Sequence, residues 1–189
     1  PLYYVQKNTL LVLVCLLFGG VNYSLSQDKN KDYYVACVGF YNVENLFDTI
    51  RDVNINDEEY LPENGWTHKK YRQKLRNLER VISEIGTSEQ QPNNPVILGV
   101  CEIENRKVLE DLVQMPKLLK KDYGIIHFDS PDGRGIDVGL LYQKAHFVPT
   151  SFASMPLRVK RTDEPEKWLK SRDQLLVTGL LDGEEISFI

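Results

Sequence analysis

The chain has 189 residues, of which 42% are hydrophobic, 10% aromatic and 26% charged, as in an ordinary globular domain. Its 27 acidic residues outnumber the 23 basic ones, for a formal net charge of −4, so the sequence does not favour binding of a polyanion through diffuse positive charge. A metal-centred phosphodiester site stays compatible with this balance, because a bound ion supplies positive charge locally.

Residues 1–26 have the features of a signal peptide. Lys7 precedes a run of nine apolar residues, LLVLVCLLF, whereas a membrane-spanning helix needs about 20. The Ser-Leu-Ser that follows supplies small residues for cleavage before Gln27. We therefore predict a signal peptide at 1–26, a linker at 27–34, and a periplasmic or secreted protein with no stable membrane partner after cleavage. A retained membrane anchor is the alternative.

Two strand patterns each end on polar groups. They are ACVGFYNVENLF at 36–47 and VILGVCEIEN at 96–105. Counting with a period of two places Asn42 after Val38 and Phe40 on one face, and Glu102 after Leu98 and Val100 on another. A carboxylate removed from water costs several kcal/mol unless it is compensated, so Glu102 indicates a ligand site. Ligands of α/β proteins gather at such carboxyl ends of strands.

Two cysteines, Cys37 and Cys101, occupy these strands on the faces opposite Asn42 and Glu102. Export would permit a disulfide between neighbouring strands. We favour two buried thiols, because small apolar strand positions accept cysteine readily.

Residues 48–65 form an acidic segment, DTIRDVNINDEEYLPENG. Its acidic and amide residues from Asp52 onward have the spacing of a calcium loop, but Asp57 occupies the position that needs glycine. We expect a solvated surface loop, with calcium binding as the alternative.

Two helices are predicted next. Apolar residues at intervals of three and four follow Thr67, a suitable N-cap, and stop at Gly86. The basic residues between them suit a solvated face better than a nucleic-acid patch. Asn105 is expected to cap a second helix whose inward positions begin with Val108 and Leu109.

A hairpin is predicted from GIIHF at 124–128 and IDVGLLY at 136–142. Arg134 in its turn could hold a phosphate in the fork of its guanidinium, or pair structurally with Asp132 or Asp137. After residue 144, a proline-interrupted edge strand precedes a second hairpin around Asp182-Gly183.

The stretches FYNVENL, GVCEIEN and SPDGRGIDVGLLYQ together resemble the endonuclease/exonuclease/phosphatase family, which is related to deoxyribonuclease I, and most closely its secreted bacterial members. The resemblance implies a two-sheet α/β sandwich with outer helices, of which 35–189 is an incomplete, N-terminal half. By this resemblance, Glu102 and Asn42 would bind Mg²⁺ or Mn²⁺. Asn42 would also orient the phosphate and the catalytic acid. Glu104 is the rival metal ligand and ranks second, because it lies beyond the apolar run, while Glu44 is expected to be a loop or cap residue.

The implied activity is metal-dependent phosphodiester hydrolysis by an exported, endonuclease-like enzyme acting on nucleic acid. Arg134, Asp137 and His127 would contact the substrate. A lipid or inositol-phosphate phosphodiesterase and a non-catalytic binding module are the alternatives. The family's later His strand, the Asp-x-Asn motif that follows it and the closing Asp-His pair are not in these 189 residues. Asp52 and Asn54 have the Asp-x-Asn spacing, but they follow no apolar strand and precede Glu102, which is the wrong order for the family. We therefore expect the chain by itself to fold poorly and to be inactive.

Overall fold

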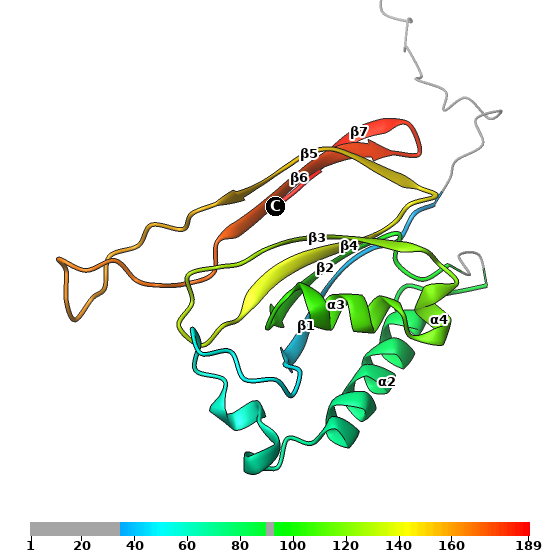
Figure 1. The fold of residues 1–189 in the computed structure, drawn as a ribbon. Helices are drawn as coiled ribbons and strands as arrows, with labels where there is room; N and C mark the ends of the chain where they lie inside the picture. The colour runs from blue at the N-terminus through cyan, green and yellow to red at the C-terminus, as the bar shows by residue number, and fades with distance from the viewer. Residues whose placement is uncertain (1–34, 90–92) are drawn as a thin grey trace, which may run out of the picture. The chain divides into compact units, whose positions relative to one another are not determined.

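The computed structural model describes residues 35–89 and 93–189, so the predicted signal peptide and linker lie outside the described residues. The described chain forms two β-sheets. Helices cover one face of the first sheet and the second sheet covers the other (Figure 1). This is the two-sheet α/β sandwich with outer helices that the sequence predicts. Within the described residues, no helix is long and apolar enough to cross a membrane.

The first sheet has the strand order β1-β2-β4-β3. Strands β1 and β2 are parallel, and the remaining pairs are antiparallel. The parallel pair requires a crossover, which is supplied by helix α2. The bounds are β1 Val38–Leu46, β2 Ile97–Ile103, β3 Tyr123–Phe128 and β4 Asp137–Gln143.

The second sheet is antiparallel, with the order β5-β6-β7 and the bounds Phe147–Met155, Gln174–Leu181 and Glu184–Phe188. Strand β5 lies at its edge, and the register shifts after Pro149, which has no N–H to donate to the ladder. The turn between β6 and β7 has φ of 47° at Asp182 and 93° at Gly183, the left-handed values that a two-residue hairpin requires. Both the edge strand and this hairpin confirm the sequence prediction.

The predicted helices are present with their predicted caps. Helix α2 spans His68–Glu84, and the Thr67 hydroxyl accepts a hydrogen bond from the Lys70 amide (3.4 Å). In α3, Arg106–Val113, the Asn105 side chain accepts one from the Val108 amide (3.1 Å). Three short helices were not predicted from the sequence; they are η1 Glu58–Tyr60, η2 Pro62–Asn64 and α4 Pro116–Leu119.

Two hydrophobic cores result from this layering. The larger core lies between the helices and the first sheet; Leu75, Ile82, Leu98 and Leu109 are fully buried in it. The smaller core lies between the sheets and includes Ile97, Ile126, Leu140, Phe147 and Val177. Each core is built from alternate residues of the same strands, since Ile97 and Leu98 point to opposite faces of β2.

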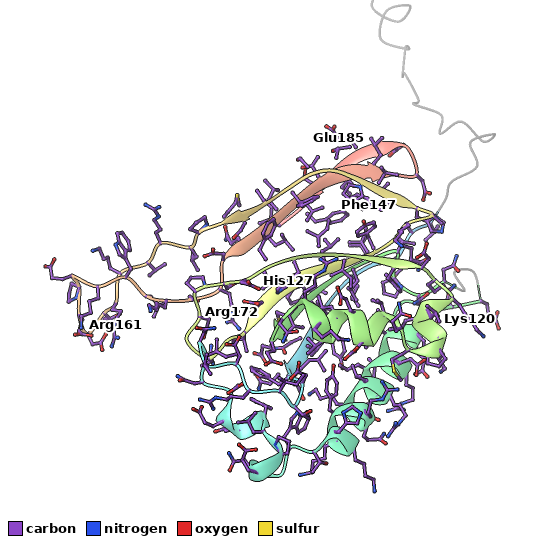
Figure 2. All side chains as sticks on the ribbon, in the orientation of Figure 1. Lys120, His127, Phe147, Arg161, Arg172 and Glu185 are labelled. Atoms are coloured by element: carbon purple, nitrogen blue, oxygen red, sulfur yellow. The ribbon has the colours of Figure 1, made fainter. Side chains whose placement is uncertain are left out.

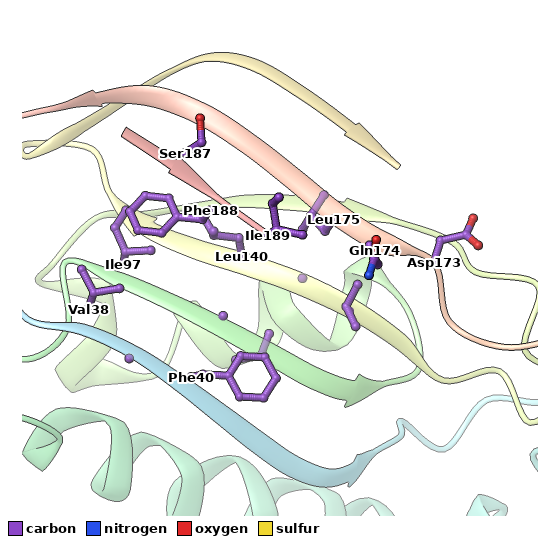
Figure 3. Close-up of a pocket in the computed structure, with 15 residues that line it drawn as sticks. Val38, Phe40, Ile97, Leu140, Asp173, Gln174, Leu175, Ser187, Phe188 and Ile189 are labelled. Carbon is purple, nitrogen blue, oxygen red and sulfur yellow. The ribbon is translucent and has the colours of Figure 1, made fainter. Parts of the chain in front are cut away.

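An apolar cleft of about 670 Å³ continues the core between the sheets. It is lined by side chains such as Val38, Phe40, Leu140, Leu175 and Phe188 (Figure 3). Val38 is 48% exposed and Phe40 73% exposed, so this face of β1 is open, whereas Val43 and Leu46 of the same strand are buried in the core beneath the helices. A phosphate would find few polar partners in such a cleft, which places the candidate site elsewhere.

Both cysteines, Cys37 and Cys101, are free and partly buried. The free thiols agree with the prediction, but neither residue is fully buried as the prediction had it.

Candidate active site

Irregular backbone marks the carboxyl ends of β1 and β2. Asn42 lies opposite Cys101 in the parallel pair, and the register shifts immediately after it. A second shift, between Cys101 and Ile103, interrupts the pairing of β2 with β4. Three residues here adopt left-handed backbone: φ is 55° at Glu44, 60° at Asn45 and 63° at Glu102. Such conformations cost about 1–3 kcal/mol each and gather at functional sites.

The bulge at Glu102 corrects the prediction made from period-two counting. Ile103, not Glu102, joins Leu98 and Val100 in the core beneath the helices. The additional residue at the bulge removes Glu102 from that face, because a bulge shifts the alternation of side chains. The Glu102 side chain is 24% exposed, and Arg172 Nη1 lies 3.9 Å from its Oε1. Its carboxylate therefore meets solvent and a cation instead of hydrocarbon.

Other basic side chains also lie close to Glu102. The pKa of Arg134 is raised, first by its hydrogen bond to Asp132 and also by the negative charge of Glu102. Lys74 on α2 donates a hydrogen bond to the Glu44 carbonyl (2.6 Å). Burial lowers the pKa of Lys74, while the charges of Glu44 and Glu102 oppose that shift. Positive side chains from a helix and two loops thus interact electrostatically with Glu102, and of these Arg172 contacts its carboxylate at 3.9 Å.

Arg134 is held by Asp132, one of the two structural pairings that the sequence left open. Its Nε and Nη2 lie 3.2 and 3.1 Å from the two Asp132 oxygens, and its backbone amide also donates to Asp132 (2.9 Å). Asp132 is buried, whereas the Arg134 side chain is 67% exposed. The pairing fixes the base of the guanidinium and leaves its outer surface available to a solute.

His127 and Asp137 form a buried pair, with Nε2 3.0 Å from Oδ2. The two side chains are only 3% and 5% exposed. The other Asp137 oxygen accepts a hydrogen bond from the Ser130 amide (2.7 Å). In this conformation the pair supports the loop that carries Arg134 and does not face a dissolved substrate.

Among the described residues, His127, Asp129 and Asp137 are the group of three whose ligand atoms lie close enough to hold a metal ion. The two carboxylates face different ring nitrogens: Nε2 faces Asp137, and Nδ1 lies 3.9 Å from Asp129. An ion would need only one ring nitrogen, and the three ligand atoms lie within 4.8 Å of one another, so the group has the geometry to hold a cation. In this structure the 3.0 Å contact between His127 and Asp137 is a hydrogen bond.

Asn42 and Glu44 shape the bulge of β1. The Asn42 side-chain oxygen accepts a hydrogen bond from the Glu44 amide (2.7 Å), and both residues are exposed. Because Asn42 is paired with Cys101, the residue before Glu102, the two predicted site residues lie on adjacent strands at the same end of the sheet. The structure therefore brings Asn42 and Glu102 together, with Arg134 and Arg172 nearby.

Glu104, the rival ligand, is buried and structural. Its Oε2 accepts a hydrogen bond from the Asp48 amide (2.7 Å), and it is 6% exposed. Burial raises its pKa to about 7, and the charges of Asp48, Asp57 and Asp52 add to the shift. Glu104 thus fastens the acidic loop to the end of β2, and its burial makes it a poorer metal ligand than Glu102.

The acidic loop is mostly exposed, as predicted, but one of its carboxylates is buried. Asp57 is 1% exposed, accepts a hydrogen bond from the Asp52 amide (2.6 Å) and pairs with Arg51 (3.0 Å). That ion pair lacks hydrogen-bond geometry at Asp57 Oδ1. Asp52 Oδ1 accepts a hydrogen bond from the backbone amide of Asn54, so polar groups of the loop are already hydrogen-bonded to one another. This favours a structural loop over the calcium alternative.

A divalent ion fits Glu102 by donor chemistry. Mg²⁺ takes oxygen ligands and is usually bound through one or two carboxylates, with water and phosphate completing the shell. Glu102 offers a partly exposed carboxylate, and the exposed Asn42 lies on the adjacent strand at the same end of the sheet. The site residues present are therefore compatible with Mg²⁺ or Mn²⁺.

Arg172 is the site residue that sequence reasoning missed. It belongs to the polar segment before β6 and is far from Glu102 in the chain, so no local pattern links them. The signal available was a charged pair, Arg172-Asp173, placed directly before an apolar strand. Asn42 and Glu102 also lie next to apolar strand residues, but at the carboxyl ends of their strands, whereas Arg172 and Asp173 precede the amino end of β6.

Comparison with known proteins identifies the class to which this fold and site belong. The model of the Endonuclease/Exonuclease/phosphatase family matches residues 37–189, and the chain belongs to this family. The chain is also similar to the crystal structure of an endonuclease/exonuclease/phosphatase family protein from Bacteroides thetaiotaomicron, with 16% identity and a TM-score of 0.40. That match covers 75% of this chain and 42% of the other, so the chain spans less than half of the solved relative. No curated protein matches the sequence.

Proposed function

We propose that the protein is a metal-dependent phosphodiester hydrolase, and specifically an exported, endonuclease-like enzyme. The observation that carries the proposal is the position of Glu102, a partly exposed carboxylate at a strained bulge with Arg172 3.9 Å away. Membership of a family that hydrolyses phosphoester bonds, typically with a divalent metal, supports the reaction type. The predicted signal peptide supports a periplasmic or secreted location.

Glu102, with Asn42 beside it, would hold Mg²⁺ or Mn²⁺. The bound ion would polarise a phosphoryl oxygen and stabilise the leaving oxygen. Asn42 would orient the phosphate through its side-chain NH2 group, while its oxygen, which accepts one hydrogen bond from the Glu44 amide, keeps a second lone pair for the ion. The left-handed backbone of Glu102 directs the carboxylate away from the core, so the bulge is part of the binding geometry.

The two arginines would neutralise phosphate charge. A guanidinium binds phosphate oxygens in a fork, and such charge-assisted hydrogen bonds are about twice as strong as neutral ones. Arg134 is held by Asp132 and remains two-thirds exposed, while Arg172 is 34% exposed beside Glu102. In this proposal His127 and Asp137 act indirectly, by holding the loop on which Arg134 lies.

Nucleic acid is the proposed substrate, although the net charge of −4 does not favour a broad electrostatic contact. Recognition would then rest on the local cations at the site. A lipid or inositol-phosphate ester would use the same phosphate contacts, so the substrates must be separated by experiment.

The test is hydrolysis by the protein as its gene encodes it. Plasmid DNA, RNA, sphingomyelin vesicles and inositol phosphates would each be incubated with Mg²⁺, Mn²⁺ or EDTA. We expect cleavage of DNA or RNA that EDTA abolishes. Hydrolysis of the lipid or inositol phosphate alone would reject the nuclease assignment but keep the reaction type, and no metal-dependent cleavage of any of them would reject both.

A further inference from the structure

Arg172 reaches Glu102 from the other sheet, and the chain leading to it has few buried residues. Residues 156–170 connect β5 to β6 and are mostly exposed. An arginine at the end of such a segment would be poorly fixed unless something holds the chain beside it, because ordering a long side chain costs conformational entropy.

The chain beside Arg172 is held by two serine hydroxyls. The Asp173 amide donates a hydrogen bond to Ser130 Oγ (3.3 Å), and Ser154 Oγ donates to Asp173 Oδ2 (3.0 Å). Ser154 belongs to β5, whereas Ser130 lies in the loop between β3 and β4 of the first sheet. The residue after Arg172 is therefore tied to both sheets.

Ser130 is in turn fixed by the buried pair described above. Its amide donates to Asp137 Oδ1 (2.7 Å), and Asp137 Oδ2 lies 3.0 Å from His127 Nε2. Figure 2 shows His127 and Arg172 at the same end of the two sheets. One oxygen of Asp137 thus contacts the imidazole and the other contacts the serine whose hydroxyl meets the Asp173 amide.

We infer that Asp137 and Ser130 form a positioning relay that holds Arg172 beside Glu102. The relay runs from the His127–Asp137 pair through Ser130 to the Asp173 backbone and crosses from the first sheet to the second. This gives the buried pair a role at the site although its side chains do not reach it. As a part of catalysis, the inference rests on the proposed function; as a part of the structure, it does not.

The first test reads the position of Arg172 without any reaction. Replacing Glu102 by Gln removes the charge near the Arg172 guanidinium. In the protein with no other substitution, this should move the ¹⁵Nε resonance of Arg172. In Ser130→Ala that response should shrink, because Arg172 is no longer held in place. Ser130→Thr keeps the hydroxyl and should restore the response. Ser151→Ala, at an exposed position of β5, is the matched control and should leave it unchanged. An undiminished response in Ser130→Ala would overturn the relay.

The second test is kinetic. Ser130→Ala should lower kcat/KM for the cleaved phosphodiester about fivefold, which is the typical contribution of one neutral hydrogen bond. In an Arg172→Ala background the same change should have no further effect, because the relay acts only through Arg172. A full fivefold loss in that background would reject the relay. If the unsubstituted protein hydrolyses none of the substrates, but the response of the Arg172 ¹⁵Nε resonance to Glu102→Gln is lost in Ser130→Ala, the proposed function fails and the relay stands.

Discussion

Replacing Glu104 by Gln should reduce the loss of folding stability that the protein undergoes as the pH rises from 5 to 8. Glu104 is 6% exposed and accepts the Asp48 amide hydrogen bond at 2.7 Å. Its pKa is raised from 4.5 to about 7, first by burial and then by the charges of Asp48, Asp57 and Asp52. The neutral Gln keeps an oxygen for the Asp48 amide while avoiding a buried charge.

The direction of this pH dependence follows from proton binding. Between pH 4.5 and pH 7 the unfolded chain has released the Glu104 proton while the folded chain retains it, so the free energy of unfolding falls as the pH rises. The stability that the folded state gains from a protonated Glu104 is fully present below about pH 4.5 and is lost above about pH 7. One pH unit corresponds to about 1.4 kcal/mol, so the loss between pH 5 and pH 8 is about 3 kcal/mol.

Urea unfolding in EDTA at pH 5 and pH 8 measures this difference. Glu104→Gln should lose about 3 kcal/mol less than the wild-type protein over that interval. Glu59→Gln, an exposed carboxylate in the same loop region, serves as the control and should follow the wild type. Equal pH dependence in Glu104→Gln and the wild type would refute the reasoning.

Three further changes test the fold around the site. Gly135→Ala should destabilise the protein by more than about 1 kcal/mol and lower kcat/KM, because φ is 70° and a Cβ would clash with the Ile55 side chain. Gly133→Ala, with open space around it, should do neither in the same unfolding and kinetic assays. Asn105→Ala should cost about 1 kcal/mol in urea unfolding by removing the cap of α3, and a loss near zero would show that the cap is not needed. Leu75→Ala, at a fully buried position, should cost about 2–5 kcal/mol, a result contradicted by a loss below 1 kcal/mol in the same assay.

Local patterns predicted most of the secondary structure. The caps at Thr67 and Asn105 and the turn at Asp182 depend on neighbours three or fewer residues away, so the sequence contains the whole interaction. Asn42 and Glu102 were found for a similar reason, since polar residues at the end of an apolar strand can be recognised without knowledge of the fold.

The remaining features depend on contacts between distant segments. The bulge that places Ile103 in the core where period-two counting expected Glu102 arises from the pairing of β2 with β4, which a single strand does not encode. Arg172 approaches Glu102 only because the second sheet packs on the first. The burial of Asp57 likewise follows from the folding of its loop against the rest of the chain.

Glu102 is the residue on which the functional account depends. The decisive measurement is the turnover of Glu102→Ala, made in the protein as its gene encodes it, on the phosphodiester that the wild type cleaves with Mg²⁺. Thermal unfolding of the same sample must first show that the variant is folded. The account predicts a fall in turnover by orders of magnitude with little change in Tm. Near-normal turnover in the folded variant would contradict it.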